Sequence, residues 1–224
     1  MPKIVLKTAH QEVVESISKI IQKGELQRGE KINEMKLCDL LGVSRTPIRE
    51  ALRTLNTQGL IDLVPHKGAF VSQFNAEEIS DMFDVMSVLE GMCARLATPK
   101  MSDADFEKIE ALHQNLEDHY FAKDHKEYLE TNHEYHSFIQ EIAGNKTLNE
   151  VVNGIRQKIL LYRHKQLYEP KRFDHSIQEH RDLMEAFRKR DEKKAEKLMQ
   201  RHLVKQGKAI VGLHEKDELN GKKS

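Results

Sequence analysis

Long apolar runs and an excess of one charge are both absent from this chain of 224 residues, which carries 36 basic and 36 acidic side chains. A membrane helix needs about 20 apolar residues in a row, and the stretch from Ile4 to Leu6 is too short even for a secretion signal. There are only two cysteines, Cys38 and Cys93, and both lie on apolar faces of predicted helices, where a small buried side chain is the usual role. These absences exclude a membrane protein and a disulfide-stabilised secreted domain, and we expect a cytoplasmic protein.

The length favours two domains of ordinary size, and the charge differs between them. Residues 1–74 carry 11 Lys and Arg against 8 Asp and Glu, whereas the rest carries 25 against 28. No internal repeat is visible. A basic first part on a slightly acidic second part is typical of a protein that contacts nucleic acid at one end.

A short basic helix near residue 50 is the most specific local pattern. Pro47 suits a first helical turn, and Ser44 or Thr46 can supply the N-cap oxygen. The apolar side chains recur at helical spacing and predict one buried face: Ile48, Ala51, Leu52 and Leu55. Arg45 and Arg49 lie four apart near the start of the helix, where a helix-turn-helix contacts bases and arginine binds guanine through two hydrogen bonds.

The flanking segments complete a winged helix-turn-helix with its two-helix motif at about residues 34–53. Gly42 makes the tight turn before the basic helix. Lys67 and Gly68 form a basic wing tip where backbone can approach a phosphate. The other elements are predicted as helices at Glu12–Gln22 and Glu34–Leu41 and strands at Leu60–Val64 and Ala69–Ser72.

This ordered pattern, from about Gln11 to Phe74, resembles the DNA-binding domain of the GntR family of bacterial transcription regulators. The resemblance rests on Gly29-Glu30, Asn33-Glu34, the run from Leu41 to Leu52, Gly59-Leu60 and the run from Lys67 to Val71. We predict DNA contacts from Ser44, Arg45, Thr46, Arg49, Lys67 and Gly68. One such unit has too small a footprint for a specific operator, so we expect a homodimer on a palindromic site in double-stranded DNA.

The second part, residues 75–217, reads as an all-α antiparallel bundle, followed by a polar, disordered tail at 218–224. Leucine, methionine, glutamate and lysine recur there at helical spacing, and stop signals separate the segments. The fold class is therefore mainly α. The predicted helices are Ala76–Ala97, Ser102–Ala122, Lys126–Ala143, Lys146–Leu167, Asp174–Lys189 and Asp191–Val211.

Ten of the twelve histidines lie in this second part. Asn132 and His136 are four apart and share a helix face, while His180 and His202 lie on two further predicted helices. Three imidazoles and one oxygen ligand suit zinc, nickel, manganese or iron. The alternative is a set of ordinary polar residues with satisfied hydrogen bonds.

Residues from about Ala76 to Ala209 resemble the FCD ligand-binding domain of the FadR subfamily within the GntR family. The matching residues are Val88-Leu89-Glu90, His136, Ala143-Gly144-Asn145, Leu148, Glu179-His180 and His202. The resemblance implies one divalent transition metal, zinc or nickel foremost, held by Asn132, His136, His180 and His202. Asn132 is neutral where many members have aspartate, which implies weaker binding.

The resemblance also implies a small-molecule effector, an organic acid. Met86 stands where such members commonly have an arginine that clamps a carboxylate. Arg163 or Arg156 on the Lys146–Leu167 helix could replace it, although each is more often a surface charge.

Together these patterns predict a ligand-responsive transcription regulator. One alternative is a constitutive DNA-binding dimer with a purely structural bundle. The other is a helical metalloenzyme, but no general base lies beside the histidines and no nucleophile motif is present, so we expect no enzyme.

Overall fold

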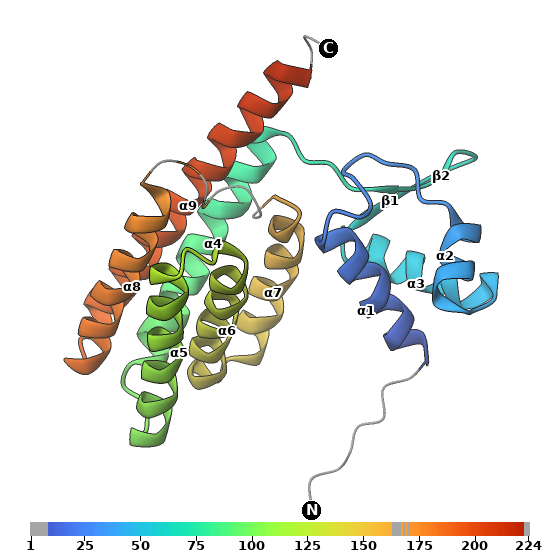
Figure 1. Ribbon diagram of the computed structural model, residues 1–224. Coiled ribbons are helices and arrows are strands. Elements are labelled where there is room, and N and C mark those ends of the chain that lie inside the picture. The colour runs from blue at the N-terminus through green and yellow to red at the C-terminus, as the bar shows by residue number, and fades with distance from the viewer. Residues whose placement is uncertain (1–8, 163–166, 168, 170, 222–224) are drawn as a thin grey trace, which may run out of the picture. The chain divides into compact units, whose positions relative to one another are not determined.

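The computed structural model describes residues 9–162, 167, 169 and 171–221, and the chain divides into two compact units at Phe74 (Figure 1). The N-terminal unit holds α1 (Ala9–Gln22), α2 (Glu34–Leu41), α3 (Arg45–Thr57), β1 (Ile61–Val64) and β2 (Gly68–Val71). The strands form an antiparallel hairpin in which Val64 lies opposite Gly68. The winged helix-turn-helix prediction is confirmed.

Local chemistry explains where these helices begin and end. The Asn33 side chain accepts hydrogen bonds from the backbone N–H groups of Met35 and Lys36 and so caps α2. Gly42 ends α2 with a φ of 67°, a left-handed conformation that favours glycine. Ser44 is the N-cap of α3, but its side chain makes no capping bond.

The predicted cap oxygen at Ser44 or Thr46 is therefore wrong. Thr46 lies inside α3, and the Ser44 hydroxyl is left for other partners. The predicted buried face of α3 is confirmed, because Ile48, Ala51, Leu52 and Leu55 are all buried. Helix α1 covers this face with Val13, Ile17 and Ile21.

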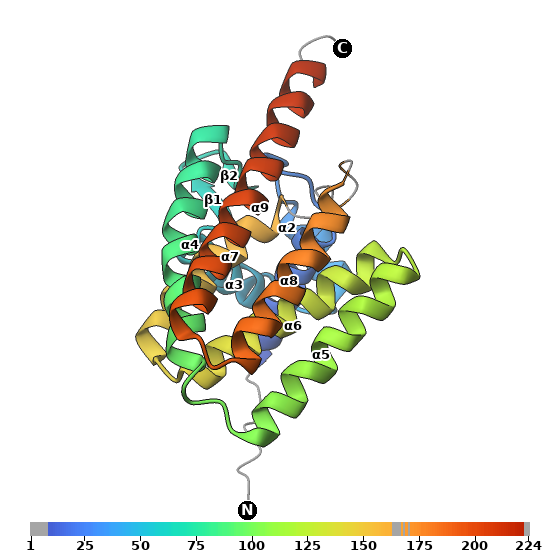
Figure 2. The same ribbon diagram turned by 90° about the vertical axis from the view of Figure 1, so that its left-hand side faces the viewer.

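The second unit is a helical bundle, as predicted (Figure 2). Capping boxes start its first two helices, at Asn75 with Glu78 and at Ser102 with Asp105. Its helices are α4 (Ala76–Ala97), α5 (Asp103–Phe121), α6 (His125–Ala143), α7 (Lys146–Leu160), α8 (Arg172–Arg188) and α9 (Glu192–Gly221).

Helices α4 and α9 pack against each other most extensively, and glycine makes their close approach feasible. A Cβ on Gly91 of α4 would lie 2.5 Å from Cγ of Gln200 on α9. A Cβ on Gly207 of α9 would lie 2.7 Å from the Phe83 side chain on α4. A larger residue at either position would therefore require the neighbouring side chain on the facing helix to shift.

Four predicted helix ends are wrong by two or more residues. Helix α1 begins at Ala9 rather than at Glu12. Helix α7 ends at Leu160 rather than at residue 167, and the buried Tyr162 ring packs on His214 just beyond it. Helix α8 begins at Arg172, two residues before the predicted start, because that side chain is buried against Glu179 on the same helix.

Helix α9 continues past the predicted end at Val211. Gly212 lies inside the helix, because a glycine there costs only about 1 kcal/mol and strong helix formers follow it. Residues 218–221, expected to be disordered, are therefore helical, and residues 222–224 lie outside the described part.

Candidate metal centre and DNA-binding surface

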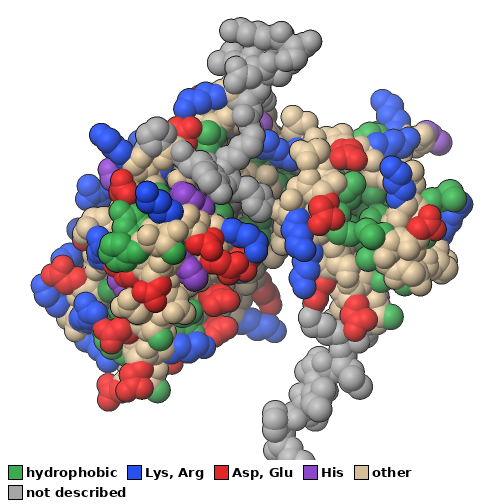
Figure 3. Space-filling view, in the orientation of Figure 1, with side chains coloured by type: hydrophobic (Ala, Val, Ile, Leu, Met, Phe, Trp, Pro, Cys, Tyr) green, Lys and Arg blue, Asp and Glu red, His purple; other side chains and the backbone are tan. Residues whose placement is uncertain are grey.

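The six residues predicted to contact DNA are all exposed on the N-terminal unit. Ser44, Arg45, Thr46 and Arg49 lie at the start of α3, and Lys67 and Gly68 lie at the hairpin turn. Lys and Arg side chains gather near the hairpin in Figure 3. This arrangement matches the two contact regions of a winged helix, one in the groove and one on the backbone.

Two details of this surface were not predicted. The Arg49 Nε lies 2.9 Å from Oε2 of Glu34 on α2, so Arg49 has a carboxylate partner in the free protein. Lys31 pairs with Phe70 of β2 through an isolated bridge, and its Cε would lie 3.5 Å from a Cβ at Gly68. Lys31 therefore adds a second cation at the wing.

Three buried histidines from three helices converge in the bundle: His136 of α6, His180 of α8 and His202 of α9. One ring nitrogen of each lies within 4.8 Å of the corresponding nitrogen on the other two. The ring centroids are 5.7 Å apart for His136 and His180, 4.8 Å for His180 and His202, and 5.2 Å for His136 and His202. Packing alone thus brings together the histidines that the sequence spreads over 67 positions.

Hydrogen bonds fix the tautomer of all three rings. The His136 Nδ1 lies 2.7 Å from Oε2 of Glu90, and the His202 Nδ1 lies 2.7 Å from Oε2 of Glu179. The His180 Nδ1 lies 2.8 Å from the backbone oxygen of Ser176. Because these oxygens only accept, each Nδ1 carries the proton and each Nε2 presents a lone pair.

The three Nε2 atoms are buried, and none of them has a hydrogen-bond partner among the described residues. Buried polar atoms of this kind are rare and costly, and three lone pairs cannot satisfy one another. A cation satisfies all three at once. Neutral imidazoles with a carboxylate or carbonyl on the other nitrogen are also the usual surroundings of histidine ligands to metals.

Two hydrogen-bonded chains of arginine, glutamate and histidine hold these rings. In the first, Arg156 of α7 bonds to Glu90 of α4, which accepts from His136. In the second, Arg172 Nη1 lies 3.1 Å from the Glu179 oxygen that accepts from His202. The first chain joins three helices, so the centre depends on the packing of the whole bundle.

Electrostatics favour charged glutamates and neutral histidines. Burial raises the pKa of Glu90, but Arg156 and His136 more than offset this and hold it below its usual range. The pKa of Glu179 is likewise lowered to about 2, because His202 and Arg172 outweigh burial. Burial lowers the pKa of His136 to about 4 against the opposing pull of Glu90, and it also lowers the pKa of His180 and His202.

Asn132 is buried on α6, one helical turn before His136. Its Nδ2 has no hydrogen-bond partner in the described part of the chain. This position is compatible with a fourth ligand, and that role stays a prediction.

Comparison with known proteins decides the family. Residues 9–71 match the family of bacterial regulatory proteins called gntR, and residues 81–205 match the FCD domain. The chain belongs to the GntR family. It is a GntR regulator with an FCD domain, as the sequence predicted, and it binds DNA through its winged helix-turn-helix.

Relatives and solved structures agree with this family. The GntR regulator is 32% identical over 166 residues to the nta operon transcriptional regulator of Aminobacter aminovorans. This alignment covers 73% of the present chain and 77% of the relative. It is 26% identical over 191 residues to the HTH-type transcriptional regulator YdhC of Bacillus subtilis, covering 83% and 84%. Its fold matches E. coli McbR/YncC with a TM-score of 0.80 at 20% identity, covering 93% and 99%. These relatives are transcription regulators, so the metalloenzyme alternative is set aside.

In the described part of the chain, no helix is long and apolar enough to cross a bilayer.

The structure changes the assessment of the predicted effector arginines. Arg156 is no surface charge, because its side chain is 2% exposed and is bound to Glu90. Arg163 lies outside the described residues. Met86 is buried in the bundle, as expected for an apolar residue on the inner face of α4.

Glu90, Glu179 and Arg172 were missed as members of the centre. The sequence identifies the two glutamates only as residues that match the FCD family. The predicted helix leaves Arg172 outside, although Arg172, Ser176 and His180 repeat every four residues and share one face of α8. Extending the predicted helix by two residues would have revealed that stripe.

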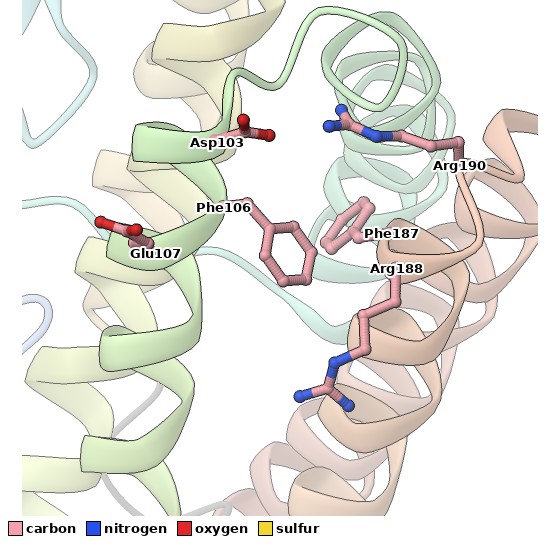
Figure 4. A pocket seen from close by; sticks show the side chains of 6 residues that line it. All are labelled: Asp103, Phe106, Glu107, Phe187, Arg188 and Arg190. Carbon is pink, nitrogen blue, oxygen red and sulfur yellow. The ribbon is translucent and has the colours of Figure 1, made fainter.

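A separate hollow of about 320 Å³ opens between α5 and α8, lined by Phe106, Phe187 and four charged residues (Figure 4). Its arginines already have partners. Arg188 bonds to Glu110 at 2.6 Å, and Arg190 donates to the backbone oxygens of Thr98 and Met101. None of the lining residues belongs to the three-histidine centre.

Proposed function

We propose that this GntR regulator binds a palindromic operator as a homodimer in the cytoplasm and that its FCD domain senses an organic acid through a bound divalent metal. The observation that carries this proposal is the convergence of three buried Nε2 atoms without hydrogen-bond partners. An all-protein explanation would need a donor for each of these atoms, and the described residues offer none.

His136, His180 and His202 would hold the metal, with Asn132 as a fourth ligand and zinc or nickel as the ion. When bound, the metal would supply a Lewis acid with positions left open for an effector oxygen. The chain's own part is to keep the imidazoles neutral and oriented, through Glu90 on His136 and Glu179 on His202.

The DNA-binding unit would place the start of α3 in the major groove. Arg45 and Arg49 would contact bases there, with Ser44 and Thr46 on the adjoining phosphates. Lys67 and Gly68 would contact the backbone at the wing, which supports affinity for all sequences.

Exposed apolar side chains support a dimer of the bundle. Helix α4 exposes Val85 and Val88, about half of each, and Val151 is similarly exposed on α7, which contacts α4. A second copy is the expected occupant, because a palindromic operator requires two DNA-binding units. Replacing Val85 and Val88 with glutamate should give a monomer in sedimentation, whereas Phe121→Glu, a matched exposed apolar residue on α5, should leave the dimer intact. A dimer that survives the valine changes would refute this interface.

An effector bound to the metal would change operator affinity only through its differential affinity for the DNA-competent and incompetent dimers. A constitutive regulator with a structural bundle would show the same operator affinity with and without metal and organic acid. Measuring that affinity under both conditions therefore separates the two.

Elemental analysis of tag-free protein tests the metal directly. We expect about one zinc or nickel per chain after incubation with the ion, in keeping with a single buried site. His180→Ala should lower metal content and effector response together, with basal DNA binding kept. His175→Ala is the matched control, because that histidine is exposed on the same helix. Less than about a tenth of an equivalent of any transition metal in the wild type would end the metal proposal.

A further inference from the structure

The wing of the DNA-binding unit has a third backbone segment that was not predicted from the sequence. The backbone of residues 29–32 runs antiparallel to β2 and exchanges hydrogen bonds of 2.8 and 2.9 Å with it. Two of these bonds flank Lys31 and Phe70, which therefore lie directly opposite each other. The chain before α2 thus belongs to the wing, and it contributes one cation there.

Lys31 lies on the outer face of this wing. Residues that are opposite each other in paired strands point to the same face, and so do residues two apart along one strand. Lys31 therefore shares a face with Phe70 and Gly68, whereas Ala69 and Val71 are buried on the inner face. Since Lys31 and Gly68 are both exposed, solvent and DNA can reach this outer face.

The Lys31 side chain extends over Gly68 toward the hairpin turn. Its Cε lies 3.5 Å from the place that a Cβ of Gly68 would occupy. Because glycine has no side chain, the lysine stem has room there, and the ammonium lies one bond beyond Cε. Lys67 of the turn directly precedes Gly68 in the chain. Two cations therefore lie at the tip of the wing, where Lys and Arg side chains gather in Figure 3.

Among the described residues, Lys31 makes no ion pair. The neighbouring Glu30 carboxylate accepts a backbone hydrogen bond of 2.8 Å instead. Asp62 belongs to the same outer face, but Phe70 lies between it and Lys31 in the register of the strands. Since the lysine stem extends toward Gly68, its ammonium is available to an anion from outside the protein.

We propose that Lys31 is a second phosphate-binding residue of the wing and contacts a different phosphate of the DNA backbone from Lys67. This inference rests on the proposed contact of the wing with DNA. A lysine ammonium is a compact charge with three donors on a flexible stem, which suits a phosphate oxygen and carries no base preference. The two lysines approach the tip from different backbone segments, so they reach neighbouring phosphates rather than the same one.

Salt titration of DNA binding by the full-length protein, with operator and scrambled duplexes, tests this contact. Lys31→Gln keeps a polar stem over Gly68 and removes the charge. We expect it to weaken binding to both duplexes roughly 5-fold at about 0.15 M salt and to reduce the slope of log affinity against log salt by roughly one unit for each bound subunit. Lys31→Arg should keep the slope of the wild type, because it keeps the charge.

Lys19→Gln is the matched control, because it removes the same charge from the same unit. Lys19 is exposed on α1, two residues from each of the buried Ile17 and Ile21, so it lies on the face away from α3. We expect this variant to keep the slope of the wild type. Replacing Lys31 and Lys67 together should reduce the slope by the sum of the two single losses, because each lysine has its own phosphate.

An unchanged slope in Lys31→Gln beside a reduced slope in Lys67→Gln overturns this inference and leaves the wing contact of Lys67 standing. If the slope is unchanged in both single variants and in the double variant, the proposed wing contact fails as well. A loss that appears only in the double variant means that the two lysines share one phosphate, which also overturns the inference. So does a loss that is confined to the operator, because a phosphate contact acts on all sequences.

Should Lys31→Gln not fold, lysine acetylation of the wild type followed by mass spectrometry decides the matter. Bound scrambled duplex must slow the acetylation of Lys31 but leave that of Lys19 unchanged. Equal rates at Lys31 with and without the duplex refute the contact.

Discussion

Each unit contains an arginine–glutamate ion pair, which is exposed to solvent in the DNA-binding unit and buried in the bundle. In the DNA-binding unit, the Arg49 side chain is 61% exposed beside Glu34, free to exchange its carboxylate for DNA. In the bundle, Arg156 and Glu90 are 2% and 3% exposed, and both are tied to the histidine centre. The comparison teaches that the surface site works through residues close in sequence and open to solvent, whereas the buried site works only if distant partners are all present.

The largest difference between the two ion pairs should appear in the free energy of unfolding when one partner of each pair is removed. Glu90→Ala leaves Arg156 buried without its carboxylate, and we expect the free energy of unfolding of the metal-free protein to fall by about 3–5 kcal/mol. Arg49→Ala breaks an exposed pair and should change it by less than about 1 kcal/mol. Urea denaturation followed by circular dichroism measures both. Similar small losses for the two variants would show that the buried pair is not what holds the centre.

The next largest effect should be a loss of stability at acid pH, which arises from the buried histidines of the bundle. The pKa of His136 is lowered by burial to about 4, from an unfolded value near 6.5. As pH falls from about 6.5 to 4, the unfolded chain takes up a proton that the folded chain does not, so stability is lost across that window and is flat above it. His136 alone would account for about 3 kcal/mol, and His180 and His202 act in the same direction.

The measurement is the urea midpoint of metal-free protein at a series of pH values. His136→Gln should flatten part of the curve, because the titrating group is gone. A midpoint that does not change between pH 6.5 and 4 in the wild type contradicts a neutral, buried histidine cluster.

Replacing the arginines predicted to contact bases should give a smaller effect, which is confined to the DNA-binding unit. Arg45→Ala or Arg49→Ala should each cost about 1–3 kcal/mol of operator binding, with much less effect on unrelated DNA. Arg53→Ala is the control, since that arginine is also exposed on α3 but lies farther from its start. Fluorescence anisotropy with operator and scrambled duplexes gives both affinities. Unchanged operator binding in the double variant would move the groove contact elsewhere.

Replacing Lys67 at the wing should give the smallest effect, a loss of affinity that is the same for all DNA sequences. Lys67→Ala should reduce the slope of log affinity against log salt by roughly one unit, because one phosphate contact is lost. The same titration at several salt concentrations measures it. A loss limited to the operator, with the slope unchanged, would make Lys67 a base-reading residue instead.

The sequence determined the DNA-binding unit almost completely. The apolar face from Ile48 to Leu55, the turn at Gly42 and the hairpin all follow from spacing, and helix α2 was predicted with both ends correct. These features are local, so neighbouring residues in the chain are sufficient to specify them. The cap at Ser44 was wrongly predicted, because whether a hydroxyl caps a helix depends on its rotamer and its competing partners. The start of α1 was also wrong, by three residues.

In the bundle, the sequence specified the helices and the resemblance supplied the histidines, but tertiary structure decided which side chains complete the centre. Glu90 and Arg156 lie 66 residues apart and meet only because α4 and α7 pack together. Periodicity shows which face of a helix is buried but not which distant face it meets. That partner is determined by close packing, as at Gly91, where a Cβ would lie 2.5 Å from the Gln200 Cγ of α9.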